Sequence, residues 1–123
     1  MTATKPKRYI ALIYTDESRD ADATPEDMQK TMQAYNAYTE AIRKAGVMET
    51  GDALDSTNTA TTVRVRNGRR LTTDGPFAET KEQLGGFYIL KCKDLDEAID
   101  WASKIPASEY GSIEVRPIME FDD

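Results

Sequence analysis

The pattern of apolar and polar positions along this chain predicts both strands and helices. Residues 8–14 form an almost unbroken apolar run, and residues 86–92 form a second one. Such short runs are typical of strands that are buried on both faces. A further strand is expected over residues 113–119, and the stretch 47–55 is ambiguous, with a short strand and an inward-pointing Leu54 as its best interpretation.

A strict alternation of apolar and polar residues predicts a β-hairpin in the middle of the chain. In residues 61–66, Val63 and Val65 lie on one face and polar side chains lie on the other. Asn67-Gly68, which follows directly, is the strongest short-range hairpin signal. Residues 69–73 are therefore expected to pair back antiparallel.

Two segments have the periodicity of amphipathic helices. The first begins at Thr24-Pro25, a hydroxyl cap followed by proline at the first helical position, and Gly46 is placed to end it. The second begins at Asp94, with Glu97 three positions later, and ends before Pro106. The inner stripes are expected to be Met28, Met32, Tyr35, Thr39, Ile42 and Ala45 in the first helix, and Leu95, Ala98, Ile99, Ala102 and Ile105 in the second.

The order of these elements predicts one domain over residues 1–123, an α+β fold with a ferredoxin-like antiparallel sheet and an added β-hairpin. Two helices can cover only one face of such a sheet. The runs at 9–14 and 87–90 are nevertheless apolar on both faces. The helix-free face should therefore be buried against a second copy of the chain, so a homodimer built sheet to sheet is expected.

Composition narrows the range of functions. The formal net charge of −6 argues against bulk attraction to nucleic acid or to an anionic membrane. No signal peptide and no membrane-spanning run is recognisable, so a soluble cytoplasmic protein is expected. The chain has a single cysteine and no histidine, which leaves no Cys/His cluster for zinc, and no metal or other cofactor is expected.

The lack of histidine also limits catalysis. The side chain best suited to proton transfer near neutral pH is missing, so this work would fall to a carboxylate, a lysine, a tyrosine or Cys92. Cys92 shares a strand face with Tyr88 and Leu90. It is expected to be a buried, inert thiol.

The segment 74–87, which reads DGPFAETKEQLGGF, is the most particular motif of the chain. Asp-Gly-Pro is strong turn chemistry, because aspartate bonds to nearby backbone, glycine tolerates positive φ and proline fixes its own φ. Phe77 is an apolar residue inside a polar loop and is expected to be tucked beneath it. Gly85-Gly86 allows another backbone to approach closely.

This motif resembles the signature of the YCII-related family, in particular its branch named for Asp-Gly-Pro-Phe. The similarity continues at residues 9–14, 94–98 and 111–117 and so spans nearly the whole chain. The resemblance implies a dimeric α+β barrel, in a family whose biochemical role is mostly unassigned. Family members are often encoded near sigma factors of the extracytoplasmic-function class, which implies an accessory role in transcriptional regulation.

The motif loop supports two interpretations. In the functional one, a pocket between sheet and loop is lined by Asp74, Glu79, Lys81 and Glu82, with Phe77 as a further ligand-binding residue. Asp74 would then be a ligand contact or a general base. In the structural one, Asp74 caps its own turn and Lys81 pairs with a neighbouring glutamate.

Two further positions are candidates for ligand binding. Family members often carry a histidine near Tyr110, so the Asp–His pair proposed for catalysis in related proteins lacks its imidazole here. Tyr110 could orient a ligand, or it could be a packed residue at the rim. Arg116 could bind a carboxylate or phosphate together with Glu114 on the same strand face, or the two could form an ion pair.

The predicted hairpin is basic in an otherwise acidic chain, through Arg64, Arg66, Arg69 and Arg70. It could bind an anion, dock on the acidic surface of a second subunit, or be solvated. Without interleaved aromatic residues these charges are a weak nucleic-acid signal, and no direct contact with nucleic acid is expected.

Together these features favour a homodimer that binds a small polar or anionic ligand, or a regulatory protein partner, without strong catalysis. The alternative is a small-molecule enzyme, an isomerase or a dehydrochlorinase-like lyase. Asp74 would then be the base, its pKa raised by burial beside Phe77, with Tyr110 and Arg116 orienting the substrate.

Overall fold

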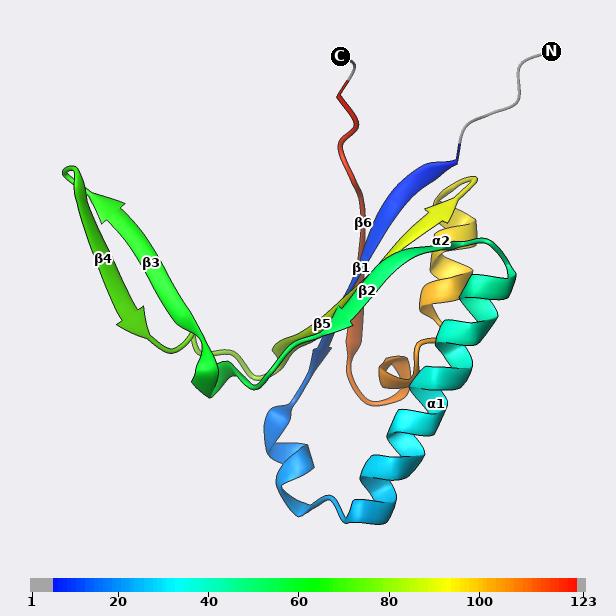
Figure 1. Ribbon diagram of the computed structural model, residues 1–123, viewed down its shortest axis with the longest axis horizontal. Coiled ribbons are helices and arrows are strands. Elements are labelled where there is room, and N and C mark those ends of the chain that lie inside the picture. Colours follow the sequence, from blue (N-terminus) through cyan, green and yellow to red (C-terminus); the bar gives the residue numbers. More distant parts are fainter. Residues whose placement is uncertain (1–5, 122–123) are drawn as a thin grey trace.

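The computed structural model describes residues 6–121, which form an α+β fold (Figure 1). The strands in this part of the chain are β1 (Lys7–Thr15), β2 (Met48–Ala53), β3 (Thr61–Arg66), β4 (Arg69–Asp74), β5 (Gln83–Cys92) and β6 (Ser112–Pro117). The α-helices are α1 (Pro25–Lys44) and α2 (Leu95–Ala102), and short 3-10 helices are η1 (Glu17–Asp22), η2 (Thr57–Thr59) and η3 (Pro106–Glu109). None of the described helices is long and apolar enough to cross a bilayer.

Four of the strands form one antiparallel sheet with the order β2-β5-β1-β6. The central strand β1 pairs with β5 and β6, so that Ile10 lies between Ile89 and Arg116. β3 and β4 form a separate two-stranded sheet, in the register that the Asn67-Gly68 turn dictates. Both turn residues have positive φ, 53° and 75°. The predicted ferredoxin-like α+β plan with an added hairpin is confirmed.

The predicted helix starts are confirmed in atomic detail. Thr24 and Asp27 form a reciprocal capping box, in which each side chain accepts a hydrogen bond from the other residue's backbone N–H at 3.1 and 3.2 Å. In α2, the Asp94 carboxylate accepts from the N–H of Glu97 at 2.9 Å. α2 ends earlier than expected, because Pro106 begins η3 after a short connection instead of closing the helix.

A single hydrophobic core lies between one face of the four-stranded sheet and the helices α1 and α2. The rings of Tyr38 and Tyr88 form a T-shaped contact with 5.1 Å between centroids, and the Tyr38 hydroxyl donates to the carbonyl of Trp101 at 3.0 Å. The buried residues of this core are Tyr9, Ala11, Ile13, Tyr38, Ile42, Val47, Tyr88, Leu90, Cys92, Ala98, Ala102, Ile105 and Ala107.

Several residues of the predicted inner stripes do not reach this core. Met28 and Met32 are 64% and 65% exposed, because the first turns of α1 extend past the end of the sheet (Figure 1). In α2 the small residues Ala98 and Ala102 face the sheet, so Leu95 and Ile99 lie at the margin and are about half exposed. The expectation that Leu54 points inward was also wrong: it follows the last residue of β2 and is 47% exposed.

None of the described helices lies on the opposite face of the sheet. Its centre is apolar and consists of Ile10 and Leu12 of β1 beside Ile89 and Phe87 of β5, all of them partly exposed. We call these four residues the apolar strip. The expectation that β1 and β5 are buried on both faces is therefore not met within one chain, since no described element covers the strip.

Gly111 is placed where a side chain would collide with the central strand. A Cβ atom there would lie 2.2 Å from the carbonyl oxygen of Tyr14, while at Gly85 it would meet nothing within 4 Å. We expect Gly111→Ala to lower the free energy of unfolding by about 1–3 kcal/mol, the range of overpacked sites. Urea unfolding measures this, with Gly85→Ala as the matched control. Equal effects of the two substitutions would contradict the packing account.

Candidate functional site

A pocket of ≈ 490 Å³ lies on the helix-covered side of the molecule, between α1 and the end of the sheet. Its floor comes from the end of β1, the end of β2 and the start of β5, and its wall comes from α1, η1 and Tyr110. The pocket exists because α1 continues beyond the sheet. The volume is in the range of small-molecule binding sites.

Tyrosines give the pocket its mixed polar and aromatic character. Tyr35, Tyr88 and Tyr110 all line it. The Tyr88 hydroxyl shares a hydrogen bond of 3.0 Å with the hydroxyl of Thr39. Burial, with the neighbouring phenol of Tyr110 as a further cause, raises the pKa of Tyr35 to about 12. Tyr35 is therefore a neutral hydrogen-bonding group throughout the physiological range.

Arg19 supplies a positive charge to the same wall. Its guanidinium carbon lies 3.6 Å from the centroid of the Tyr110 ring, a cation–π contact. Among the described residues, no carboxylate forms an ion pair with Arg19. Arg43 also lines the pocket but pairs with Glu40 at 3.5 Å, and Asp20 and Asp52 are further residues of the lining.

The loop that carries the Asp-Gly-Pro-Phe motif lies at the root of the hairpin and outside this pocket. Gly75, with φ of 99°, donates its N–H to the carbonyl of Ala60 at 2.6 Å, and the Thr62 hydroxyl donates to the carbonyl of Gly75 at 2.8 Å. Asp74 is exposed at the end of β4. Phe77 is 79% exposed, so the expectation that it is tucked beneath the loop was wrong: no described element packs over this part of the loop.

The charged residues of the motif do not gather around a common centre. Glu79 and Lys81 are exposed, and Lys81 pairs with neither Glu79 nor Glu82. Glu82 instead accepts a hydrogen bond from the hydroxyl of Ser112 at 2.8 Å. Only the end of the motif, residues 85–87, lines the pocket, and the Phe87 side chain points to the opposite face of the sheet. Of the residues predicted as site residues, Tyr110 alone is brought to it.

Arg116 lies on the helix-free face of the sheet, away from the pocket. Its guanidinium pairs with Glu114 at 3.0 Å, and Glu114 also accepts from the Tyr14 hydroxyl at 3.3 Å. The structure thus has the ion-pair arrangement that was the alternative to ligand binding. An exposed pair of this kind contributes little stability.

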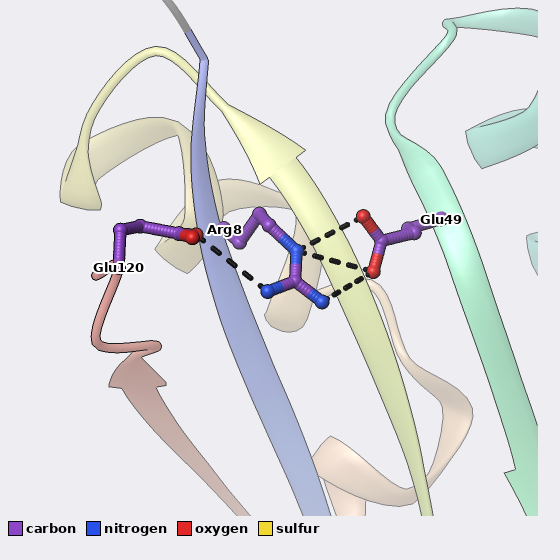
Figure 2. Close-up of polar contacts among 3 residues, drawn as sticks. All are labelled: Arg8, Glu49 and Glu120. Carbon is purple, nitrogen blue, oxygen red and sulfur yellow. Dashed lines mark hydrogen bonds and ion pairs between the residues drawn. The ribbon is translucent and has the colours of Figure 1, made fainter. Parts of the chain in front are cut away.

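Arg8 was not predicted as a special residue, although it spans the helix-free face. Its guanidinium binds Glu49 of β2 at 2.6 Å and lies 3.6 Å from Glu120 beyond β6 (Figure 2). The hydrogen bonds from Arg8 lower the pKa of the Glu49 carboxyl. Arg8 thereby links both edges of the sheet across its face, an arrangement that depends on strand order and has no local sequence signal.

Cys92 is buried in the core, as predicted. Burial, with the charge of Glu97 as a second cause, raises the pKa of its thiol to about 11. The thiol is therefore protonated near neutral pH, where a thiolate would be the nucleophile.

Comparison with known proteins identifies a family and a relative of this chain. The family described as the YCII-related domain matches residues 8–122. A protein of Rhizobium meliloti (strain 1021), described as "Uncharacterized protein R00369", is 39% identical over 112 residues, which cover 89% of this chain and 90% of that protein.

The raised pKa of Tyr35 makes a prediction about alkaline stability. Its folded pKa of about 12 lies above the ordinary value of about 10, so the native state holds this proton more tightly than the unfolded state does. The stabilisation is complete below pH 10 and is lost as the pH rises through 12. We expect the free energy of unfolding of Tyr35→Phe to fall less steeply over this interval than that of the wild type. Denaturant melts at stepped pH check this, with Tyr14→Phe as control, and equal slopes for all three proteins would contradict it.

Proposed function

This chain belongs to the YCII-related family, and we propose that it works as a homodimer that binds a small organic anion in the pocket between α1 and the sheet. The observation that carries the ligand proposal is Arg19: a guanidinium stacked on Tyr110, at the wall of a ≈ 490 Å³ pocket, with no carboxylate partner among the described residues. Such a guanidinium can form two charge-assisted hydrogen bonds with a carboxylate or phosphate.

The rest of the lining defines the kind of molecule that carries the anion. Met48 and Ile13 offer apolar surface, while the threonine and tyrosine hydroxyls offer hydrogen bonds. Asp20 disfavours a negative group at its own position and so orients the anion toward Arg19. A ligand with a planar apolar body and one anionic end, such as an aromatic carboxylate, satisfies these surfaces.

A ligand-binding role is better supported than a catalytic role in which Asp74 is the general base. The enzyme alternative requires a buried Asp74 beside a buried Phe77, whereas both residues are exposed in the single chain and neither lines the pocket. An accessory role in regulation, which the family resemblance implies, would then act through ligand binding or protein contact. The net charge of −6 disfavours a role that depends on direct contact with DNA.

The homodimer proposal is supported by the surface that one chain leaves open. The accessible surface of one chain is 9411 Å². A compact monomer of 13.8 kDa is expected to expose roughly 6,600 Å², so this chain exposes about two-fifths more. Part of this surface is the apolar strip on the helix-free face, flanked by the ion pairs of Arg8 and Arg116. An apolar centre with a charged margin is the anatomy of a protein interface.

The ligand proposal is tested with a panel of benzoate, salicylate and phenyl phosphate, with benzyl alcohol as the uncharged comparison. We expect at least one anion to raise the Tm of the wild type, and Arg19→Gln to weaken its binding about tenfold or more, because a charge-assisted hydrogen bond is lost. Lys104→Gln is the matched control, since Lys104 stacks on Trp101 outside the pocket. Equal binding to wild type and Arg19→Gln would contradict the role of Arg19.

The homodimer proposal predicts a specific effect of charge on the apolar strip. Leu12→Glu should convert the dimer to monomer at micromolar concentration. In the dimer the new carboxylate would be buried against the apolar strip of the other copy or against the same carboxylate there, and burying an unpaired charge is costly. Sedimentation velocity measures this, and circular dichroism confirms that the monomer is folded. Ile99→Glu, at an apolar residue of α2 that is 48% exposed, is the control and should remain dimeric. A wild type that sediments only as monomer would overturn the proposal.

A further inference from the structure

The hairpin of β3 and β4 stands away from the rest of the molecule (Figure 1). It projects beyond the four-stranded sheet, on the side opposite α1 in this view. Val63, Val65 and Leu71 are 59%, 62% and 49% exposed, and every residue of β4 is exposed. A two-stranded hairpin alone in water is marginally stable at best, so an arm of this kind calls for a surface to rest on.

The root of the arm is held firmly, which fixes the direction in which it projects. The Gly75 hydrogen bonds to Ala60 and Thr62 close its base. The Glu17 carboxylate accepts from both the N–H and the hydroxyl of Thr57, at 2.9 and 2.8 Å, and so ties η1 to the segment that leads into the arm. The arm is thus a preorganised projection, which lowers the entropic cost of docking.

The charge of the arm is opposite to that of the body. Residues 61–74 contain four arginines and Asp74, a net charge of +3. Because the net charge of the whole chain is −6, the rest of the chain has a net charge of −9. In the β3–β4 register, Arg70 lies opposite Val65, on the face that also carries Val63. One face of the arm therefore combines Val63 and Val65 with one arginine, Arg70, while Arg64, Arg66 and Arg69 lie on the other face.

A groove with the complementary character lies on the body between η1 and the first turns of α1. Its volume is ≈ 760 Å³, and it is lined by the exposed Met28 and Met32 together with the carboxylates of Asp20, Asp22 and Asp27. The segment 16–27 around it contains six carboxylates and a single arginine, a net charge of −5. Arg19 and Lys30 also line the groove, so the groove itself is apolar and only weakly acidic, within a strongly acidic segment.

We propose that the arm of one copy docks in the η1–α1 groove of a second copy, with Val63 and Val65 against the methionines and Arg70 against the aspartates. This inference rests on the proposed homodimer and adds a second contact to it. The charges favour a second copy as the occupant of the groove, because each chain has both a basic arm and a groove within an acidic segment. In a two-fold dimer, each arm would occupy the groove of the other subunit.

Arm docking would also complete the ligand pocket. Arg19, Asp20 and Tyr35 line both the pocket and the groove, so the two hollows share a wall. An arm in the groove would border this wall and bring the partner subunit's Arg70 near the anion site. The pocket of each subunit would then be closed only in the dimer.

A charge-swap experiment tests the proposal. Variant A carries Arg70→Glu in the arm, and variant B carries Asp20→Arg and Asp22→Arg in the groove. Each variant alone should dimerise at least about tenfold more weakly than the wild type, because both docking contacts set like charges together. An equimolar mixture should recover dimers of nearly wild-type affinity, since both contacts in the A–B pair are again complementary. Asp96→Arg with Asp100→Arg on α2 is the control and should dimerise as the wild type.

The outcomes separate this inference from the homodimer itself. A wild type that is only monomeric overturns both. A dimeric wild type whose affinity is unchanged in variants A and B overturns arm docking alone, as does a mixture that fails to recover. Loss of binding to a random DNA duplex in variant A, with dimerisation unchanged, would instead make the arm a nucleic-acid contact.

A measurement on the wild type keeps the test independent of how the variants fold. Arm docking predicts that the dimer dissociation constant rises severalfold between low and high salt, because screening weakens contacts between exposed charges. A salt-independent constant would overturn it.

Discussion

The constraint on which this structure depends is a four-stranded sheet that is covered by helices on one face only. β1 is central, with β5 and β6 on either side, and its alternate residues Tyr9, Ala11 and Ile13 are buried beneath α1 and α2. The residues between them point to the other face, where Arg8 and its carboxylate partners span the sheet beside the apolar strip. A strand of period two under a single layer of helices must leave half of its side chains facing outward.

The features that the sequence predicts well are those set by local chemistry. The Thr24 cap, the Asp94 cap and the Asn67-Gly68 turn each depend on residues within four positions of one another, and each forms as predicted. Element order follows from these signals, which is why the ferredoxin-like plan could be predicted from the sequence. Apolar residues that recur every two positions also correctly predicted strands, and those that recur every 3.6 positions correctly predicted helices.

The exposure of particular residues and the position of the pocket could not be predicted, because both depend on where elements end relative to one another. Met28 and Met32 fit the helical period, yet they are exposed because the first turns of α1 extend past the end of the sheet. The pocket joins Arg19, Tyr35 and Tyr110, which come from different elements and have no shared sequence motif. The motif made Asp74 the predicted site residue, whereas only the last three residues of the motif line the pocket.

The physical role of the motif loop links the pocket to the arm. Gln83 at the end of this loop accepts a hydrogen bond from the N–H of Glu17 at 2.8 Å and donates one to the carbonyl of Thr80 at 2.5 Å. Glu17 in turn holds Thr57 at the root of the arm. The 3-10 helix that carries Arg19 is therefore bonded both to the motif loop and to the segment leading into β3. A ligand that fixed Arg19 would stabilise the same short helix that positions the arm, so ligand binding and arm docking would favour each other through a shared element.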